Sequence, residues 1–285
     1  MNELAILAST KNYNAGNREI ETKIHSIYQL LKNQKNLSPT ESKKLLDEAL
    51  KLKNGPQPMT LYCFPYAGGS SAFFESWKPL FSSEVKIVPI EYSGRGKKSN
   101  LPLIKTLPEM LDAIETELLP QLRAPFAFFG HSLGAVLAFE IAQSLSRKKI
   151  SPQALFLSGC PAPDRIQTIA SIQNEDDSSF AAILKELGGT PPELFESTLF
   201  RDTFLPILRA DFSLLDGYHK EIAPLDIPLI VFGGSKDNKV SFNDLNAWEK
   251  WSSNSCSVSI LEGDHFFLRN SKLIIQKIEA TACPS

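Results

Sequence analysis

One short stretch of the sequence decides the fold: Phe126-Ala127-Phe128-Phe129-Gly130-His131-Ser132-Leu133-Gly134-Ala135. An apolar segment typical of a buried strand runs directly into the pattern Gly-x-Ser-x-Gly, and a segment typical of a helix follows. Glycine is required on both sides of such a turn, because a Cβ at Gly130 or Gly134 would collide with neighbouring backbone. We therefore expect a sharp turn that lifts the Ser132 hydroxyl out of a sheet, at the positive end of the following helix.

The sequence on either side of this turn alternates between short apolar segments and helical ones. Strands are expected at residues 59–64, 85–90, 126–130, 154–158, 228–233 and 257–261. Helices are expected at residues 107–118, 133–145, 242–251 and 273–278. This order predicts an α/β fold with a mostly parallel central sheet flanked by helices. The interval 164–223 has a helical pattern but no good strand, so we expect a helical lid insertion beside the C-terminal ends of the strands.

Residues 1–58 differ in composition from residues 59–285. They contain nine basic and six acidic residues and close with the turn-forming run Asn54-Gly55-Pro56-Gln57-Pro58, which places a domain boundary near residue 58. Apolar residues recur at helical spacing from Ile20 to Leu31, and Ser38-Pro39-Thr40-Glu41 is typical of a second helix start. The sequence thus predicts a helical N-terminal extension, which either lies on the main domain or serves as a docking element for another protein.

Composition and charge exclude several classes of function. The formal net charge of −2 provides no basic field, so we do not expect nucleic acid as a partner. No apolar run approaches the ~18–20 residues that a membrane-spanning helix needs, and we expect a cytoplasmic protein. The four cysteines and four histidines match no metal-binding spacing, so we expect reduced thiols, no metal and no cofactor. The chemistry must then come from side chains.

A serine hydroxyl becomes a good nucleophile only when a base takes its proton and an acid orients that base. His265 follows the last expected strand in a glycine-containing loop, and it is the only histidine so placed. Asp237, just past the strand at 228–233, is the preferred acid, with Asp164 as the main rival and Asp264 poorly placed as the sequence neighbour of His265. The remaining histidines are interpreted as structural or solvated, with His131 pointing away through the turn: His25, His131 and His219.

An oxyanion formed at Ser132 needs two backbone N–H donors. Leu133, directly after the serine, is the first of them. The glycine-rich loop that closes the first expected strand supplies the second, from Ala67 or its neighbour Tyr66. A dinucleotide-binding loop is the alternative interpretation, but Gly68-Gly69 lacks the Gly-x-Gly-x-x-Gly spacing.

These motifs together resemble a known family over about residues 59 to 270. The matching segments are Phe64-Pro65-Tyr66-Ala67-Gly68-Gly69, Ser93-Gly94-Arg95-Gly96, Gly130-His131-Ser132-Leu133-Gly134-Ala135, Leu157-Ser158-Gly159, Leu208-Arg209-Ala210-Asp211-Phe212, Phe232-Gly233-Gly234 with Asp237, and Gly263-Asp264-His265-Phe266-Phe267. They are similar to the type II thioesterases of nonribosomal peptide and polyketide synthesis. The resemblance implies an α/β-hydrolase fold and a catalytic triad of Ser132, Asp237 and His265.

The resemblance also implies a substrate and a partner. The substrate is an acyl thioester on the phosphopantetheine arm of an acyl or peptidyl carrier protein, and the expected role is removal of misloaded or stalled acyl groups by a monomer. An acidic carrier would need a basic landing surface, for which Arg95, Lys97 and Lys98 are candidates; the alternative is that these residues form an exposed, solvated run of charges. Three alternatives stay open: a chain-releasing thioesterase, a general serine esterase, and a non-catalytic protein that recruits a synthase.

The sequence departs from the family pattern at two places near the expected site. Tyr66 stands where the family usually has histidine, which changes a pocket wall but not the backbone donor. Cys160 follows Ser158-Gly159 where basic residues are typical; we interpret it as a buried small thiol rather than a site residue. The segment 37–46 is similar to linker and docking helices of synthetase assembly lines, although this motif is short.

Overall fold

The computed structural model describes residues 18–33, 37–54, 57–166, 175–187, 195, 197–270 and 272–283. The chain divides into two compact units, Met1–Pro58 and Met59–Ser285, and each is considered by itself. Parts of two predicted segments lie outside the described residues: positions 1–17, 34–36 and 55–56 of the N-terminal extension, and positions 167–174, 188–194 and 196 of the lid.

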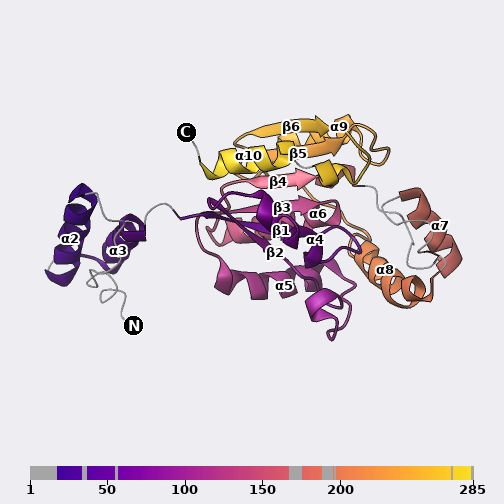
Figure 1. Cartoon of the computed structure of the whole chain (residues 1–285), viewed down its shortest axis with the longest axis horizontal. Helices are drawn as coiled ribbons and strands as arrows, with labels where there is room; N and C mark the ends of the chain where they lie inside the picture. The colour runs from indigo at the N-terminus through magenta and orange to yellow at the C-terminus, as the bar shows by residue number, and fades with distance from the viewer. Residues whose placement is uncertain are drawn as a thin grey trace. The chain divides into compact units, whose positions relative to one another are not determined.

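The N-terminal unit is a pair of helices, α2 (Arg18–Asn33) and α3 (Pro39–Asn54) (Figure 1). The two helices bury a small apolar cluster between them, formed by Ile24, Ile27, Leu31 and Ala49. The predicted start of α3 is confirmed, because the Ser38 N–H donates to the Glu41 carboxylate at 2.8 Å and the Glu41 N–H donates to Ser38 Oγ at 3.3 Å. The hydrogen bonds from Ser38 lower the pKa of Glu41 below its ordinary value. The apolar stripes seen in the sequence therefore find partners within this unit.

A six-stranded sheet forms the centre of the second unit, in the order β2-β1-β3-β4-β5-β6. Its strands are β1 (Met59–Phe64), β2 (Val85–Pro89), β3 (Phe126–His131), β4 (Leu155–Ser158), β5 (Leu229–Gly234) and β6 (Cys256–Leu261). All five pairings are parallel. The predicted α/β fold is confirmed, and each predicted strand end lies within one residue of the observed one.

Helices cover both faces of this sheet (Figure 1). The helices that cover it are α4 (Ser71–Glu75), α5 (Leu107–Leu118), α6 (Leu133–Arg147), α9 (Phe242–Asn246) and α10 (Lys272–Ala282). Two more helices, α7 (Asp177–Leu187) and α8 (Leu205–Ser213), belong to the predicted lid. Short 3₁₀ segments lie at Lys78–Leu80, Gly96–Lys98, Leu119–Gln121, Pro163–Arg165, Ala247–Trp251 and Phe267–Asn270, with a π-helical turn at Phe200–Phe204. Alternate strand residues face opposite sides: Phe126 and Phe128 pack with α5 and α6, whereas Ala127 and Phe129 pack with α4 and α10.

The direction of the chain changes between β1 and β3. From β1 the chain passes to β2 at the edge and then returns to β3 on the other side of β1. In such parallel sheets the ligand site lies outside the carboxyl ends of the strands, at this switch point. Phe64 pairs with Gly130 across β1 and β3, so the loop after β1 and the turn after β3 begin side by side.

The described part of the predicted lid contains helices α7 and α8, ends in turns and irregular backbone, and contains no strand. Figure 1 shows α7 and α8 beyond the end of the sheet toward which the strand arrows point. An apolar cluster of their own holds them together, formed by Phe180, Leu184, Phe195, Phe200, Leu205 and Leu208. The described lid segment therefore lies beside the C-terminal ends of the strands, where the site is expected.

Candidate active site

Ser132 occupies the predicted sharp turn between β3 and α6. Its backbone has φ 54° and ψ −120°, a conformation that residues other than glycine rarely adopt and that marks a constrained position. A Cβ at Gly130 would lie less than 3.0 Å from the Gly134 carbonyl oxygen, and one at Gly134 equally close to the Phe64 carbonyl oxygen. The predicted need for two glycines is thus confirmed by the backbone on both sides of the serine.

The loops after β5 and β6 bring Asp237 and His265 together. Asp237 Oδ2 lies 2.7 Å from His265 Nδ1, and the aspartate side chain is fully buried. Two backbone bonds tie these loops to each other, since Ser235 N–H donates to the Leu261 oxygen at 2.7 Å and Lys236 N–H to the Gly263 oxygen at 2.8 Å. The neighbouring positions of β5 and β6 in the sheet therefore bring together two residues that are 28 positions apart.

The Asp237 carboxylate is held in its ionised form. Burial alone would raise its pKa, but the hydrogen bond and charge of His265 and the N–H groups of Lys239 and Val240 more than offset burial and lower the pKa. These two N–H groups donate to Asp237 Oδ1 at 2.9 and 3.3 Å. An ionised carboxylate accepts from Nδ1–H, which leaves the Nε2 lone pair of His265 available as a base.

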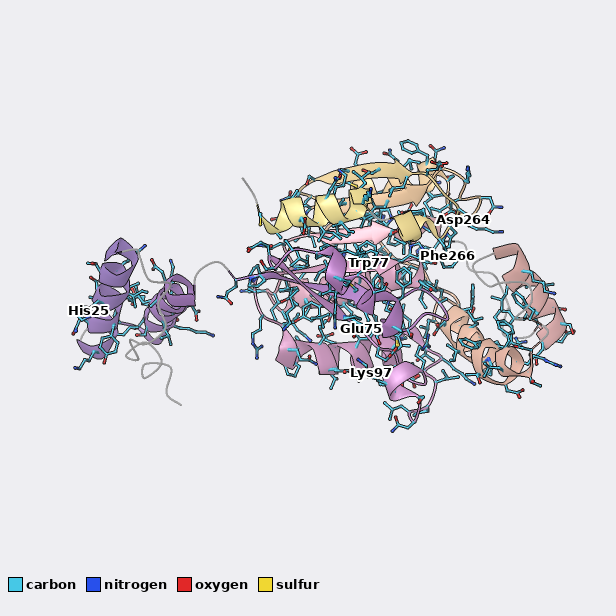
Figure 2. All side chains as sticks on the ribbon, in the orientation of Figure 1. His25, Glu75, Trp77, Lys97, Asp264 and Phe266 are labelled. Atoms are coloured by element: carbon cyan, nitrogen blue, oxygen red, sulfur yellow. The ribbon has the colours of Figure 1, made fainter. Side chains whose placement is uncertain are left out.

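The two rival acids have other partners. Asp164 forms an ion pair with Lys250 and accepts the indole N–H of Trp251 at 2.9 Å. Asp264 is exposed and accepts the Phe266 N–H at 2.8 Å. Asp264 and Phe266 are labelled in Figure 2. Of the three aspartates, only Asp237 contacts the His265 ring among the described side-chain contacts.

Ser132 and His265 approach the same point of the backbone. The Ser132 N–H donates to the Ser158 oxygen at 2.8 Å, and a Cβ at the next residue, Gly159, would lie 3.4 Å from His265 Cε1. Among the described residues no hydrogen bond joins the Ser132 hydroxyl to His265. Bonds of this kind are often long in structures without substrate and shorten when the substrate binds.

His131 lies beside His265, with their ring centroids 5.1 Å apart. It is fully buried, its Nδ1 lies 3.1 Å from Ser158 Oγ, and its Nε2 has no partner. Burial, followed by the charge of His265, lowers the pKa of His131 well below its ordinary value, so the ring is neutral. The prediction that His131 is a structural residue agrees with its complete burial, but the prediction that it points away from the site is wrong, because its ring lies beside that of His265. In the sequence only its adjacency to Ser132 indicated this position.

The second expected oxyanion donor, Ala67, lies in the loop after β1. Tyr66 to Gly69 form a β-turn, in which the Gly69 N–H donates to the Tyr66 oxygen at 2.8 Å and Gly68 has φ 75°. The close packing of Gly134 on the Phe64 and Pro65 carbonyl oxygens places the start of α6 against this loop. The hydrogen bonds of the described residues leave the N–H groups of Ala67 and Leu133 unused.

The predicted basic landing surface is wrong for Arg95. Its side chain is only 3% exposed and pairs with Asp211. Lys98 is 24% exposed and pairs with Glu117. The Lys97 side chain is 77% exposed, and its Nζ lies 3.5 Å from Glu75 Oε1. Figure 2 labels both residues. Only Lys97 of the three thus presents an accessible charge.

Other groups considered in the sequence lie outside this constellation. Cys160 is buried, and burial raises the pKa of its thiol to about 12, so it is protonated at neutral pH. All four cysteines are free. No group of three or more metal-ligating side chains was found in the described part of the chain. In the same part, no helix is long and apolar enough to cross a bilayer.

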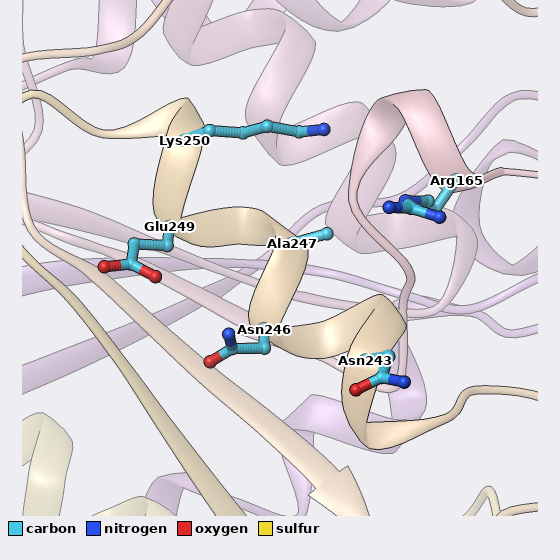
Figure 3. A pocket seen from close by; sticks show the side chains of 6 residues that line it. All are labelled: Arg165, Asn243, Asn246, Ala247, Glu249 and Lys250. Atoms are coloured by element: carbon cyan, nitrogen blue, oxygen red, sulfur yellow. The ribbon is translucent and has the colours of Figure 1, made fainter.

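A surface pocket of about 530 Å³ opens between the 3₁₀ turn at Pro163–Arg165 and the helical segment that includes α9 (Figure 3). Its lining residues are Arg165, Asn243, Asn246, Ala247, Glu249 and Lys250. Lys250 is also the ion-pair partner of Asp164, so the rival acid belongs to this region. None of the predicted site residues lines the pocket.

Three features together define an α/β-hydrolase fold. They are the parallel sheet, the serine with positive φ at the turn between a strand and a buried helix, and the Asp–His pair on two neighbouring loops. Residues 59–282 match the family model described as "Thioesterase domain". The chain belongs to this thioesterase family.

Relatives and solved structures agree with this assignment. The gramicidin S biosynthesis protein GrsT of Aneurinibacillus migulanus is 34% identical over 221 residues, which cover 77% of this chain and 86% of that protein. ClbQ from the colibactin NRPS/PKS pathway superimposes with a TM-score of 0.73 at 31% identity, over 79% of this chain and 98% of ClbQ. YbtT, a type II thioesterase from the yersiniabactin pathway, gives a TM-score of 0.70 at 31% identity, over 79% and 92% of the two chains.

Proposed function

We propose that this chain is a serine hydrolase that cleaves acyl thioesters from the phosphopantetheine arm of acyl or peptidyl carrier proteins, removing misloaded or stalled groups. The observation that carries the proposal is the partly buried Asp237–His265 hydrogen bond at the C-terminal ends of the strands, where Ser132 also lies. Its similarity to proteins named for peptide and polyketide pathways supports the choice of substrate.

The geometry suggests a two-step mechanism. His265 Nε2 takes the proton of Ser132 as its oxygen attacks the thioester carbonyl carbon, and Asp237 stabilises the imidazolium that forms. The N–H groups of Ala67 and Leu133 hold the oxyanion. As the C–S bond breaks, the carrier thiolate takes the proton from His265. Water, deprotonated by the same ring, then attacks the acyl group on Ser132 and releases a free acid and the regenerated serine.

A side-by-side hydrolysis assay tests this proposal. The acetyl group is carried either on a carrier protein or on acetyl-pantetheine, and the wild type is compared with Ser132→Ala. We expect the wild type to prefer the carrier form and the variant to lose more than about 10³-fold in kcat, since nothing else in the site replaces the nucleophile. Circular dichroism of Ser132→Ala checks that the fold survives.

Each outcome selects one function. Retention of most activity in Ser132→Ala would exclude this nucleophile. Equal turnover of the two substrates by the wild type would favour a general serine esterase. A second comparison, of acetyl with a long acyl chain on the same carrier protein, tests chain release, which a preference for the long chain would favour. No turnover of either substrate would favour a non-catalytic recruiting role for the chain.

A further inference from the structure

A buried ion pair lies next to the turn that carries Ala67. Arg95, from the loop after β2, directs Nη1 and Nη2 at Asp211 Oδ2 and Oδ1 over 2.5 and 2.6 Å. Their side chains are 3% and 0% exposed. Two parallel N–H···O bonds between planar groups give this pair a fixed geometry. A buried pair of this kind is often no more stabilising than apolar residues of similar size, so stability alone does not explain it.

The remaining bonds of the pair go to the turn. The Gly68 N–H donates to Asp211 Oδ2 at 2.7 Å, and Arg95 Nη1 donates to the Gly69 oxygen at 3.4 Å. Leu208 lies on the same face of α8 one turn before Asp211 and packs on Gly68, where a Cβ would lie 2.6 Å from Leu208 Cδ2. Helix α8 of the lid segment therefore holds Gly68 by a hydrogen bond and by packing, and Arg95, fixed by its pairing with Asp211, contacts the next residue, Gly69.

The geometry of the turn relates the positions of Gly68 and Gly69 to the direction of the Ala67 N–H group. The Tyr66 oxygen is directed into the turn, where it accepts the Gly69 N–H at 2.8 Å. In a trans peptide the C=O and N–H groups point in opposite directions, so the Ala67 N–H points out of the turn. Holding Gly68 and Gly69 fixes the closing bond of the turn and, through it, the direction of this N–H. An oxyanion donor is effective only when its direction is set before the reaction.

We propose that Arg95 and Asp211 are positioning residues that hold the Tyr66–Gly69 turn so that the Ala67 N–H is aimed at the oxyanion. The inference rests on the proposed function, in which Ala67 is an oxyanion donor. It also gives the lid helix α8 a part in the chemistry, since the carboxylate on that helix accepts the turn's N–H. Neither residue touches the substrate in this account.

A double variant tests the proposal. Removing one partner would leave a buried unpaired charge, so both are replaced, as Arg95→Met/Asp211→Leu. We expect kcat for acetyl-pantetheine to fall about 10- to 100-fold, with KM changed less than about threefold, because the oxyanion exists only after the attack. The matched control is Lys220→Met/Glu140→Leu, a second ion pair with side chains 20% and 9% exposed, for which kcat should stay within about twofold of the wild type.

Two further measurements separate positioning from a merely structural role. Butylboronic acid forms a tetrahedral adduct with an active serine and places an oxygen in the oxyanion site; its affinity should fall by the same factor as kcat/KM. Arg95→Lys keeps the charge but not the two-pronged geometry, and its kcat should lie between the wild type and the double variant.

Full kcat and full boronate affinity in a folded double variant would overturn the proposal, as would full kcat in Arg95→Lys if the double variant does not fold. A wild type that leaves the acetyl group intact both on pantetheine and on the carrier protein would instead contradict the proposed function. The boronate affinities would then decide the positioning role without a substrate.

Discussion

Asp237 is the residue whose role the geometry separates most sharply from its rivals. Its carboxylate holds Nδ1 of His265, whereas Asp164 is bound to Lys250 and Trp251. We expect Asp237→Asn to lower kcat on the order of 10³- to 10⁴-fold, since the amide favours the wrong tautomer of the ring and cannot stabilise its charged form. Asp164→Asn is the matched control and should keep kcat within about threefold. Steady-state hydrolysis of acetyl-pantetheine measures both, and a larger loss in Asp164→Asn would reverse the assignment.

The Asp237 carboxylate also predicts how the stability of the folded protein depends on pH. Because the pKa of Asp237 is lower in the folded chain than its ordinary value of 3.8, its contribution to stability is complete above that value. It is lost as the pH falls below 3.8 through the lowered pKa, since the unfolded chain then binds the proton more readily. We expect the free energy of unfolding in urea to fall more steeply with acid in the wild type than in Asp237→Asn. Parallel curves for the two proteins would contradict this linkage.

The environment of a residue can be predicted from the sequence when the groups that it contacts are close to it along the chain. The elbow glycines were predictable because every group they would meet belongs to a short, local motif or to the strand beside it. The burial of Arg95 was not, since its partner Asp211 lies 116 residues further along the chain. The residues around a basic side chain in a polar loop do not indicate that it will be buried against an acidic residue far along the chain.

At the scale of elements, the turn between β3 and α6 is packed directly on the end of β1. A Cβ at position 134 would meet the Phe64 and Pro65 carbonyl oxygens, which are backbone and cannot move aside as a side chain can. We expect Gly134→Ala to lower the free energy of unfolding by about 3 kcal/mol or more and to remove activity with it. Urea unfolding measures the loss.

The control for this prediction is Gly217→Ala. Gly217 has φ 64°, but a Cβ there would meet nothing within 4 Å. Its substitution should cost about 1 kcal/mol, from backbone strain alone. Equal losses in the two variants would mean that strain, and not collision with β1, accounts for the sensitivity of the elbow.

The central strands β3 and β4 were the most predictable elements, because they are buried on both faces and so appear as continuous apolar runs bounded by turns. The order in which the strands of the sheet pair is not contained in those runs. It follows from the crossovers, and it decides that the loops after β5 and β6 are neighbours and that Asp237 meets His265. The proximity of His131 to His265 is of the same kind, since it depends on the loop after β6 returning over the end of β3.

At the scale of the whole molecule, each of the two units has an apolar core of its own. The predicted site residues all belong to the second unit, and so does the match to the thioesterase family model. The chain 59–285 should therefore fold without residues 1–58. We expect its kcat and KM for acetyl-pantetheine to stay within about twofold of the full chain, and its Tm to stay within a few degrees.

The carrier-bound substrate makes the same deletion a test of the N-terminal helices. If residues 1–58 serve for docking, KM for acetyl groups on a carrier within its synthase should rise in chain 59–285, while kcat on acetyl-pantetheine is unchanged. An unchanged KM on the carrier would end the docking hypothesis. A loss of kcat on acetyl-pantetheine would show instead that the second unit needs the first for its own structure.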